Sequence, residues 1–162
     1  MSADPDDVVR IRGRLRGVER EAKGQAWAKE RPWRRESHVW WEQGVPVVDL
    51  HDLGAALARQ AVREVLEVPA GAGAVVFVHG RGRHSVGPQV LAGVVAKELD
   101  RACAETRGWR YRRIGAARTV WVSDPRRAPD WATGRWGPLV WAGWLGLGGC
   151  VVAAVGHALG WW

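Results

Sequence analysis

Two histidines follow two short apolar runs in this sequence, and each lies beside groups that suit chemistry on a phosphate. Residues 47–52 read VVDLHD, and residues 75–85 read VVFVHGRGRHS. An imidazole titrates near neutral pH and can serve as acid or base, while a loop rich in Gly and Arg can bind an anion. We expect Asp49, His51 and His79 to form a catalytic centre for phosphodiester cleavage.

The loop after the second run has the composition of a phosphate-binding segment. Gly80 and Gly82 allow backbone N–H groups to turn toward an anion, and the helix expected next contributes the partial positive charge of its N-terminus. Three side chains add donors, namely Arg81, Arg83 and His84. We expect Ser85 to cap the helix.

Cleavage of a phosphodiester needs a proton acceptor, a proton donor and positive groups near the charged transition state. The pattern casts His51 as the acid or base, oriented by Asp49, and His79 as its partner or as a phosphate ligand. With RNA the nucleophile could be the 2′-hydroxyl, whereas with DNA it must be water. In the structural alternative, Asp49 only caps the backbone or pairs with an arginine, and each histidine is a satisfied group at a strand end.

Hydrophobic periodicity predicts the elements that position these residues. A strand–helix–strand–helix order makes the first two strands parallel, and Gly115 and Ala116 link the last two as a hairpin. Ligands bind at the carboxyl ends of parallel strands, where both histidines come together. The expected fold class is α/β, a small mixed sheet in β-α-β-α-β-β order within a two-layer sandwich: strand 47–51, helix 54–67, strand 74–79, helix 86–107, strand 110–114 and strand 118–123.

Four parts are expected along the chain. Residues 1–46 form an N-terminal extension, residues 47–124 the α/β domain, residues 125–136 a basic Pro-rich linker and residues 137–162 a tail helix. Apolar spacing predicts an amphipathic basic helix over 8–26, which packs beside the sheet or lies on phosphates. The Trp- and Arg-rich stretch 27–46 is expected to be an irregular, partly buried connector, with base stacking as the alternative.

Positive charge is concentrated next to the candidate site. The formal net charge is +7, and residues 79–118 hold nine Lys or Arg against three Asp or Glu. A localised basic excess favours a polyanionic partner, nucleic acid ahead of anionic lipid, and a solvated basic surface is the alternative. Arg112 and Arg113 are candidate phosphate contacts, but side chains alternate across a strand, so at most one faces the loop.

Nothing in the spacing of cysteines and histidines indicates a metal site. Cys103 and Cys150 are far apart, without a C-x-x-C pair, and the five histidines show no H-E-x-x-H pattern. We therefore expect no metal and no other cofactor. The sparse cysteines and the absence of a secretory pattern at the N-terminus indicate a cytoplasmic domain.

The last 26 residues, 137–162, contain no Asp, Glu, Lys or Arg. That length exceeds the roughly 20 residues a helix needs to cross a bilayer, and tryptophans lie near both ends. The segment predicts an anchor in the inner membrane, and its glycines would allow helix pairing into a homo-oligomer. The alternative is an apolar tail folded back on the domain.

The order of elements and motifs resembles the Smr (small MutS-related) domain over about residues 47–124. That family carries L-D-L-H-G after its first strand, matched by Val48 to Asp52, and H-G-x-G after its second, matched by His79 to Gly82. The stretch RYRRIGAARTVWVSD is similar to the family's closing hairpin. Asp52 departs from the family glycine, which puts the turn after the first strand and the charge of the site in doubt.

The resemblance implies nucleic-acid binding and, in several members, metal-independent endonuclease activity on DNA or RNA. The main alternative is a non-catalytic module that holds a strand for another protein. A dinucleotide-binding loop is a weaker alternative, because Ser85 occupies the third glycine position of that motif and the acid expected after the next strand is missing.

Overall fold

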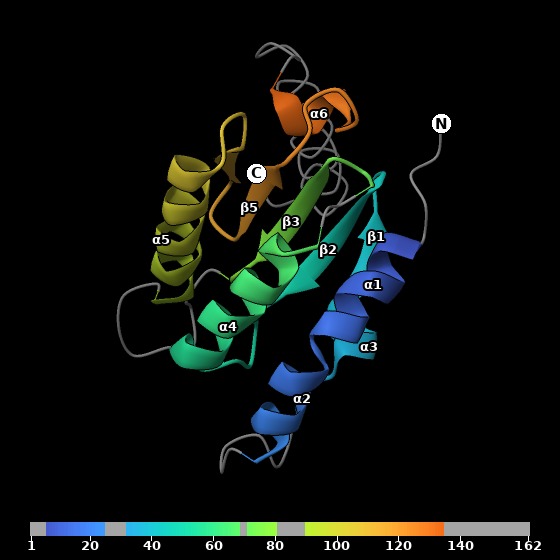
Figure 1. Cartoon of the computed structure of the whole chain (residues 1–162). Helices are drawn as coiled ribbons and strands as arrows, with labels where there is room; N and C mark the ends of the chain where they lie inside the picture. The colour runs from blue at the N-terminus through green and yellow to red at the C-terminus, as the bar shows by residue number, and fades with distance from the viewer. Residues whose placement is uncertain (1–5, 25–31, 69–70, 81–89, 135–162) are drawn as a thin grey trace, which may run out of the picture.

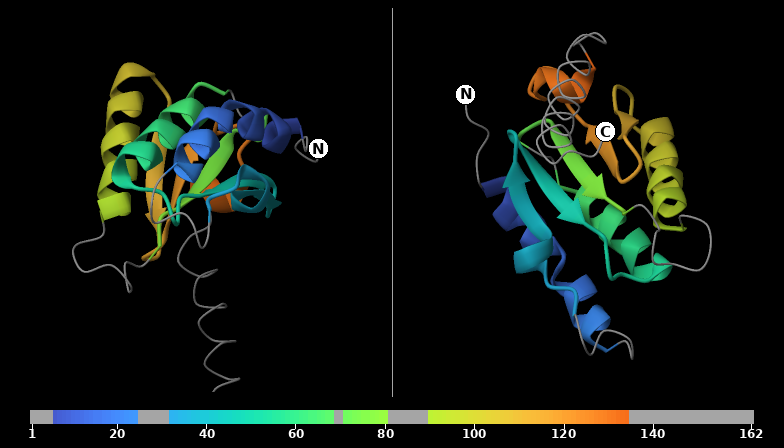
Figure 2. Two further views of the ribbon diagram at one scale, coloured as in Figure 1. Left: turned by 90° about the horizontal axis from the view of Figure 1, so that it is seen from below. Right: turned by 180° about the vertical axis from the view of Figure 1, so that it is seen from behind.

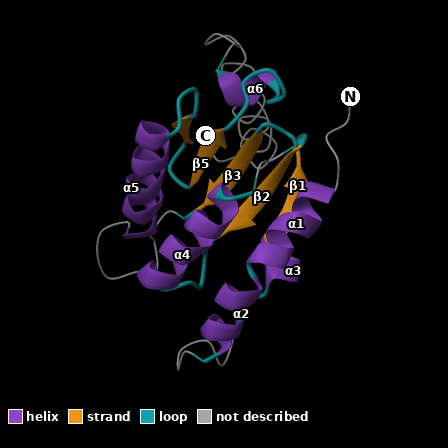
Figure 3. Cartoon of the chain, in the orientation of Figure 1, coloured by secondary structure: helices purple, strands orange, loops and turns teal. Residues whose placement is uncertain are grey.

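The computed structural model describes residues 6–24, 32–68, 71–80 and 90–134 of the 162-residue chain. It shows a mixed α/β fold built on a five-stranded sheet of order β1-β2-β3-β5-β4 (Figure 1). The strands are β1 (Val39–Glu42), β2 (Val45–Asp49), β3 (Ala74–Val78), β4 (Arg110–Ile114) and β5 (Arg118–Val122). The helices are α1 (Asp6–Arg14), α2 (Arg16–Lys23), α3 (Arg35–His38), α4 (Ala55–Leu66), α5 (Val90–Glu105) and α6 (Asp130–Thr133) (Figure 3).

The pairing of the strands places two carboxyl ends side by side. Strands β2 and β3 are parallel, with Val47 opposite Val76, and β4 and β5 form an antiparallel hairpin. Both pairings agree with the prediction from the sequence, as does the mixed sheet with its helices. Strand β5 then pairs antiparallel with β3, so β3 lies in the middle of the sheet.

Strand β1 is a correction to the sequence analysis, which expected an irregular connector over residues 27–46. Within the described part of that stretch, α3 is followed by β1, which pairs antiparallel with β2. The two-residue link, Gln43 and Gly44, has φ angles of 51° and 84°. Positive φ at both positions is typical of the tight turns that match the twist of a hairpin. Four residues, VWWE, are too few to show an alternating pattern, and the strand was therefore missed.

Helices α1, α2, α4 and α5 cover one face of the sheet, which we call the helical face (Figures 1 and 2). Their apolar stripes meet the sheet around Phe77 and Trp121, both fully buried. The N-terminal helix expected over residues 8–26 is two helices within its described part, because α1 ends at Arg14 and α2 starts at Arg16. This part of the predicted N-terminal extension is integral to the domain, because its buried residues belong to the same core as α4 and α5. They are Val8 and Ile11 of α1, Leu15 between the helices, and Val18 and Ala22 of α2.

One buried carboxylate fixes α1 to the loop that precedes β3. Asp7 is fully buried and accepts backbone N–H bonds from Gly71 at 3.0 Å and from Ala72 at 2.8 Å. Arg10 pairs with the same carboxylate. A buried charge is tolerated when it is paired and hydrogen-bonded, and all three contacts meet that requirement.

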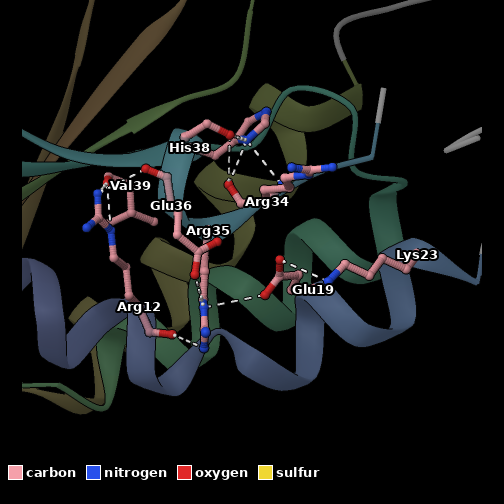
Figure 4. Close-up of polar contacts among 9 residues, drawn as sticks. Arg12, Glu19, Lys23, Arg34, Arg35, Glu36, His38 and Val39 are labelled. Atoms are coloured by element: carbon pink, nitrogen blue, oxygen red, sulfur yellow. Dashed lines mark hydrogen bonds and ion pairs between the residues drawn. The ribbon is translucent and has the colours of Figure 1, made fainter. Parts of the chain in front are cut away.

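A second set of polar contacts joins α1 and α2 to α3 and β1 (Figure 4). Arg12 donates to the carbonyl of Val39 at 3.1 Å through Nε. Glu19 accepts ion pairs from Lys23 at 3.3 Å and from Arg35 at 3.4 Å. The edge strand β1 is therefore held to the helical face by side chains as well as by its pairing with β2.

The other face of the sheet, which we call the reverse face, carries a smaller apolar cluster of β2, β3 and β5. Arg118 of β5 pairs with Glu42 of β1 at 2.7 Å, and Trp40 donates to the same carboxylate at 3.0 Å. Ala132 of α6 and Ala128, which comes shortly before the helix, belong to this cluster. The described part of the predicted linker 125–136 thus includes a short helix against the sheet.

In the described part of the chain, no helix has the length and apolar character to cross a membrane. The predicted tail helix, residues 137–162, lies outside the described residues.

Candidate functional site

The first predicted histidine lies directly after β2 and is held by the acid two residues before it. Asp49 Oδ1 accepts the backbone N–H of His51 at 2.9 Å and lies 2.5 Å from its Nδ1. The backbone N–H of Leu50 donates to Val78 at 2.8 Å, which extends the pairing with β3 to this point. Since Asp49 accepts at Nδ1, the neutral ring carries its proton there and has its lone pair on Nε2. The His51 side chain is 46% exposed.

The turn after His51 bears on the departure from the Smr pattern. Asp52 has a φ of 64°, a left-handed conformation that glycine adopts freely and aspartate adopts at some cost. The backbone here is therefore one that a glycine would allow, although the side chain brings a negative charge to an exposed position near His51.

Gly80 lies against the Nε2 edge of the His51 ring. Its φ is 75°, and a Cβ added there would lie 2.2 Å from His51 Nε2. No side chain fits in that space, so glycine at this position is needed both for its conformation and for the close approach of the imidazole. The glycine of the second motif and the histidine of the first therefore form one contact.

His79 is placed very differently. It is 4% exposed, its Nε2 lies 3.1 Å from Thr119 Oγ1, and its Nδ1 lies 3.4 Å from the carbonyl oxygen of Gly80. Burial lowers its pKa from the ordinary 6.5, and electrostatic interactions with Arg113 and with His51 lower it further, against the hydrogen bond to the Gly80 carbonyl, which raises it. The ring is then neutral at pH 7, donating from Nδ1 to Gly80 and accepting at Nε2 from the Thr119 hydroxyl.

These contacts make His79 a support for the site. Its backbone N–H donates to Ala117 at 2.8 Å, and its ring braces the carbonyl of Gly80. A group so enclosed has no open nitrogen to offer a phosphate, in contrast to the role of acid–base partner or phosphate ligand expected from the sequence. Sequence reasoning also missed Thr119, whose only signal is its place in β5, the strand that pairs with β3.

The two arginines of β4 lie on opposite faces, as strand alternation predicts. Arg113 is paired in register with Thr119, is exposed, and is near enough to His79 to lower its pKa. Arg112 is on the reverse face, where Nε donates to the carbonyl of Ala132 at 3.3 Å and Nη2 donates to that of Trp131. Arg113 is therefore beside the candidate site, whereas Arg112 holds α6.

The predicted phosphate-binding residues Arg81, Gly82, Arg83 and His84 fall in residues 81–89, outside the described residues. Gly80, which contacts His51, is the last described residue before this stretch.

Among the described residues, His, Cys, Asp and Glu side chains do not gather in threes or more at any place that could hold a metal ion. No family model matches this chain, and no curated protein and no solved structure matches it either.

Proposed function

We propose that this chain is a nucleic-acid-binding domain that cleaves phosphodiester bonds, with His51 as its acid and base. The observation that carries the proposal is the Asp49–His51 pair, an oriented and half-exposed imidazole against the backbone of Gly80. A carboxylate that fixes one ring nitrogen prepares the other to move a proton. Strand ends of a parallel pair are also where α/β sheets bind ligands.

On RNA, one histidine can carry the proton through both halves of the reaction. His51 Nε2 takes the proton of the 2′-hydroxyl as that oxygen attacks phosphorus, and then returns it to the 5′-oxygen as the P–O5′ bond breaks. Asp49 stabilises the imidazolium formed between these steps. Arg113 stabilises negative charge on the phosphate in this proposal. Arg81, Arg83 and the N–H groups of the loop keep the role predicted from the sequence, and they lie outside the described residues.

The resemblance to the Smr domain supports the same assignment, because the two matching motifs supply His51 and Gly80, which meet in space. The positive charge of residues 79–118 supports a polyanionic substrate. Within this proposal His79 and Thr119 stabilise the fold around Gly80 and take no part in proton transfer.

A specific observation favours a second candidate, a non-catalytic nucleic-acid-binding module. With His79 enclosed, His51 is the one histidine that the described residues offer at this edge of the sheet. A site with one accessible imidazole and an adjacent arginine can bind a phosphate without cleaving it.

The two candidates separate in one assay. Full-length protein is incubated in excess EDTA with labelled single-stranded RNA, single-stranded DNA and supercoiled plasmid, beside His51→Ala and a control, His38→Ala, whose histidine lies on α3. Cleavage by the parent and the control, lost in His51→Ala, establishes the nuclease and its substrate. Salt-sensitive binding with no cleavage by any protein would establish the module instead.

We also propose that residues 137–162 attach the domain to a membrane, on the strength of their uncharged, Trp-flanked sequence. Extraction of the full-length protein from membranes by detergent alone would support this, and recovery in the soluble fraction after lysis would contradict it.

A further inference from the structure

Helices α4 and α5 lie side by side on the helical face (Figures 1 and 2). Arginines from both helices surround one buried acid. Glu98 of α5 is 3% exposed. Three guanidinium groups reach its carboxylate from the two helices, namely those of Arg59, Arg63 and Arg101. We call these four residues the Glu98 cluster.

The three arginines are not equivalent. Arg63 grips the carboxylate with two hydrogen bonds, from Nε at 2.8 Å and from Nη2 at 3.1 Å. Arg59 and Arg101 each approach it with one nitrogen at 3.4 Å, and within the described structure neither donates a hydrogen bond to it. The Arg63–Glu98 pair therefore holds the cluster together. The charge of Glu98 orients Arg59 and Arg101, which keep most of their N–H donors for other partners.

The charges in the cluster do not balance. Three guanidinium groups share the carboxylate of Glu98. Asp100, next to Arg101, accepts from the neutral Tyr111 hydroxyl at 2.6 Å, which leaves its charge in place, so three cations still outnumber these two acids. Glu67, at the end of α4, pairs with Arg14. The side chains of Arg59 and Arg101 are 43% and 52% exposed. The result is a surface with excess positive charge whose arginines are oriented in advance, which lowers the entropy cost of binding an anion.

The position of the cluster connects it to the candidate site. Helix α4 starts at Ala55, four residues after His51, and Arg59 and Arg63 are one turn apart on one side of it. At 1.5 Å per residue they lie about 6 Å and about 12 Å along the helix from its first residue. A polyanion bound at His51 can therefore continue along α4 onto the cluster.

We infer that the Glu98 cluster is a second phosphate-binding site, which binds the backbone of the nucleic acid whose scissile phosphate lies at His51. Arg59 and Arg101 contact the phosphates, and Glu98 and Arg63 hold the two helices and their arginines in position. The identity of the ligand as nucleic acid rests on the proposed function, whereas the phosphate chemistry of the cluster does not.

The test uses full-length protein carrying His51→Ala, so that a bound strand stays intact. Fluorescence anisotropy measures binding of labelled 20-nucleotide RNA and 20-base-pair DNA over a series of salt concentrations. The cluster variant is Arg59→Gln with Arg101→Gln, which keeps the Arg63–Glu98 pair. The matched control is Arg126→Gln with Arg127→Gln, which removes the same charge from the loop after β5.

We expect the cluster variant to bind about tenfold more weakly at 0.1 M salt, with a slope of log affinity against log salt lower by roughly one to two. The control should change affinity less than threefold by the general loss of charge. Equal affinities and equal slopes for the two variants, with unchanged thermal unfolding, would overturn the inference.

A parent that binds no nucleic acid would contradict the proposed function but still leave the cluster open to a direct test. Inorganic polyphosphate then serves as the probe in the same comparison. Weaker polyphosphate binding by the cluster variant than by the control would sustain the phosphate site, and equal binding would refute it.

Discussion

His51 and His79 follow two adjacent parallel strands at the same edge of the sheet, yet their surroundings differ. His51 is half-exposed, its Nδ1 is hydrogen-bonded to Asp49, and its Nε2 lies next to Gly80. His79 is buried, and its partners are the Thr119 hydroxyl and the Gly80 carbonyl. The same residue type at equivalent strand ends thus gives one ring suited to proton transfer and one suited to support.

The cause is the neighbouring strand. Strand β3 lies between β2 and β5, so the residue that follows it is enclosed and meets a side chain of β5. Strand β2 has the short hairpin partner β1 on its other side, and β1 pairs with it only as far as Val48. A histidine after a central strand is therefore covered, while one after the next strand outward stays open.

Replacing the hydrogen-bond partner of each histidine should give the largest difference between the two residues. Asp49→Asn keeps an oxygen for the N–H of His51 but no longer favours the imidazolium, and we expect cleavage to fall by about 10²- to 10⁴-fold. Thr119→Val removes the partner of His79 and should leave cleavage within threefold, while it lowers the free energy of unfolding by about 1–2 kcal/mol. Initial rates of cleavage and urea unfolding measure the two effects. Loss of cleavage in Thr119→Val but not in Asp49→Asn would mean that His79, and not His51, moves the proton.

Gly80 contacts both histidines, and adding a methyl group there tests its contact with the His51 ring. Gly80→Ala should lower the free energy of unfolding by about 2–3 kcal/mol, from the left-handed backbone and from the clash with His51. In a His51→Ala background the clash is gone, and the cost should fall to about 1–2 kcal/mol. A double-mutant cycle by urea unfolding measures the difference, and strict additivity would mean that the ring does not rest on Gly80.

The lowered pKa of His79 predicts a pH dependence of stability. Above pH 6.5 the ring is neutral in both the folded and the unfolded state. As the pH falls through 6.5 the unfolded state takes up a proton and the folded state does not, so stability falls by up to about 1.4 kcal/mol per pH unit. Urea unfolding between pH 7.5 and 5 should show this loss in the parent and a smaller one in His79→Gln; parallel curves would contradict it.

The smallest effect concerns the two turns after the strands. Gly80 and Asp52 both have positive φ, but only the second is an L-residue. Asp52→Gly should raise the free energy of unfolding by up to about 1 kcal/mol and, by removing an acid beside His51, tighten binding of nucleic acid. Asp52→Asn is the control, since it removes the charge and keeps a side chain at the left-handed position. Weaker binding by both variants would mean that Asp52 contributes to the site.

The elements that the sequence predicts well are those with strong local signals. The run from Ala74 to Val78 lies between a glycine-rich stop and a glycine, and the hairpin of β4 and β5 has a glycine at its turn. Asp49 and His51 are two residues apart, so their contact could also be predicted. The burial of His79 could not, because its partner Thr119 is 40 residues further along the chain. Strand β1 was missed for a different reason, because its four residues are too few to show an alternating pattern.

The buried carboxylate of Asp7 has a consequence for how the chain matures. Its helix is synthesised before its partners, because the N–H groups that satisfy the carboxylate belong to residues 64 and 65 positions later. At roughly 5–20 residues per second, these donors are added about 3–13 s after the aspartate itself. During that interval the Asp7 carboxylate lacks its two backbone donors, and the new chain must keep it solvated or paired with Arg10 until the loop before β3 has been made.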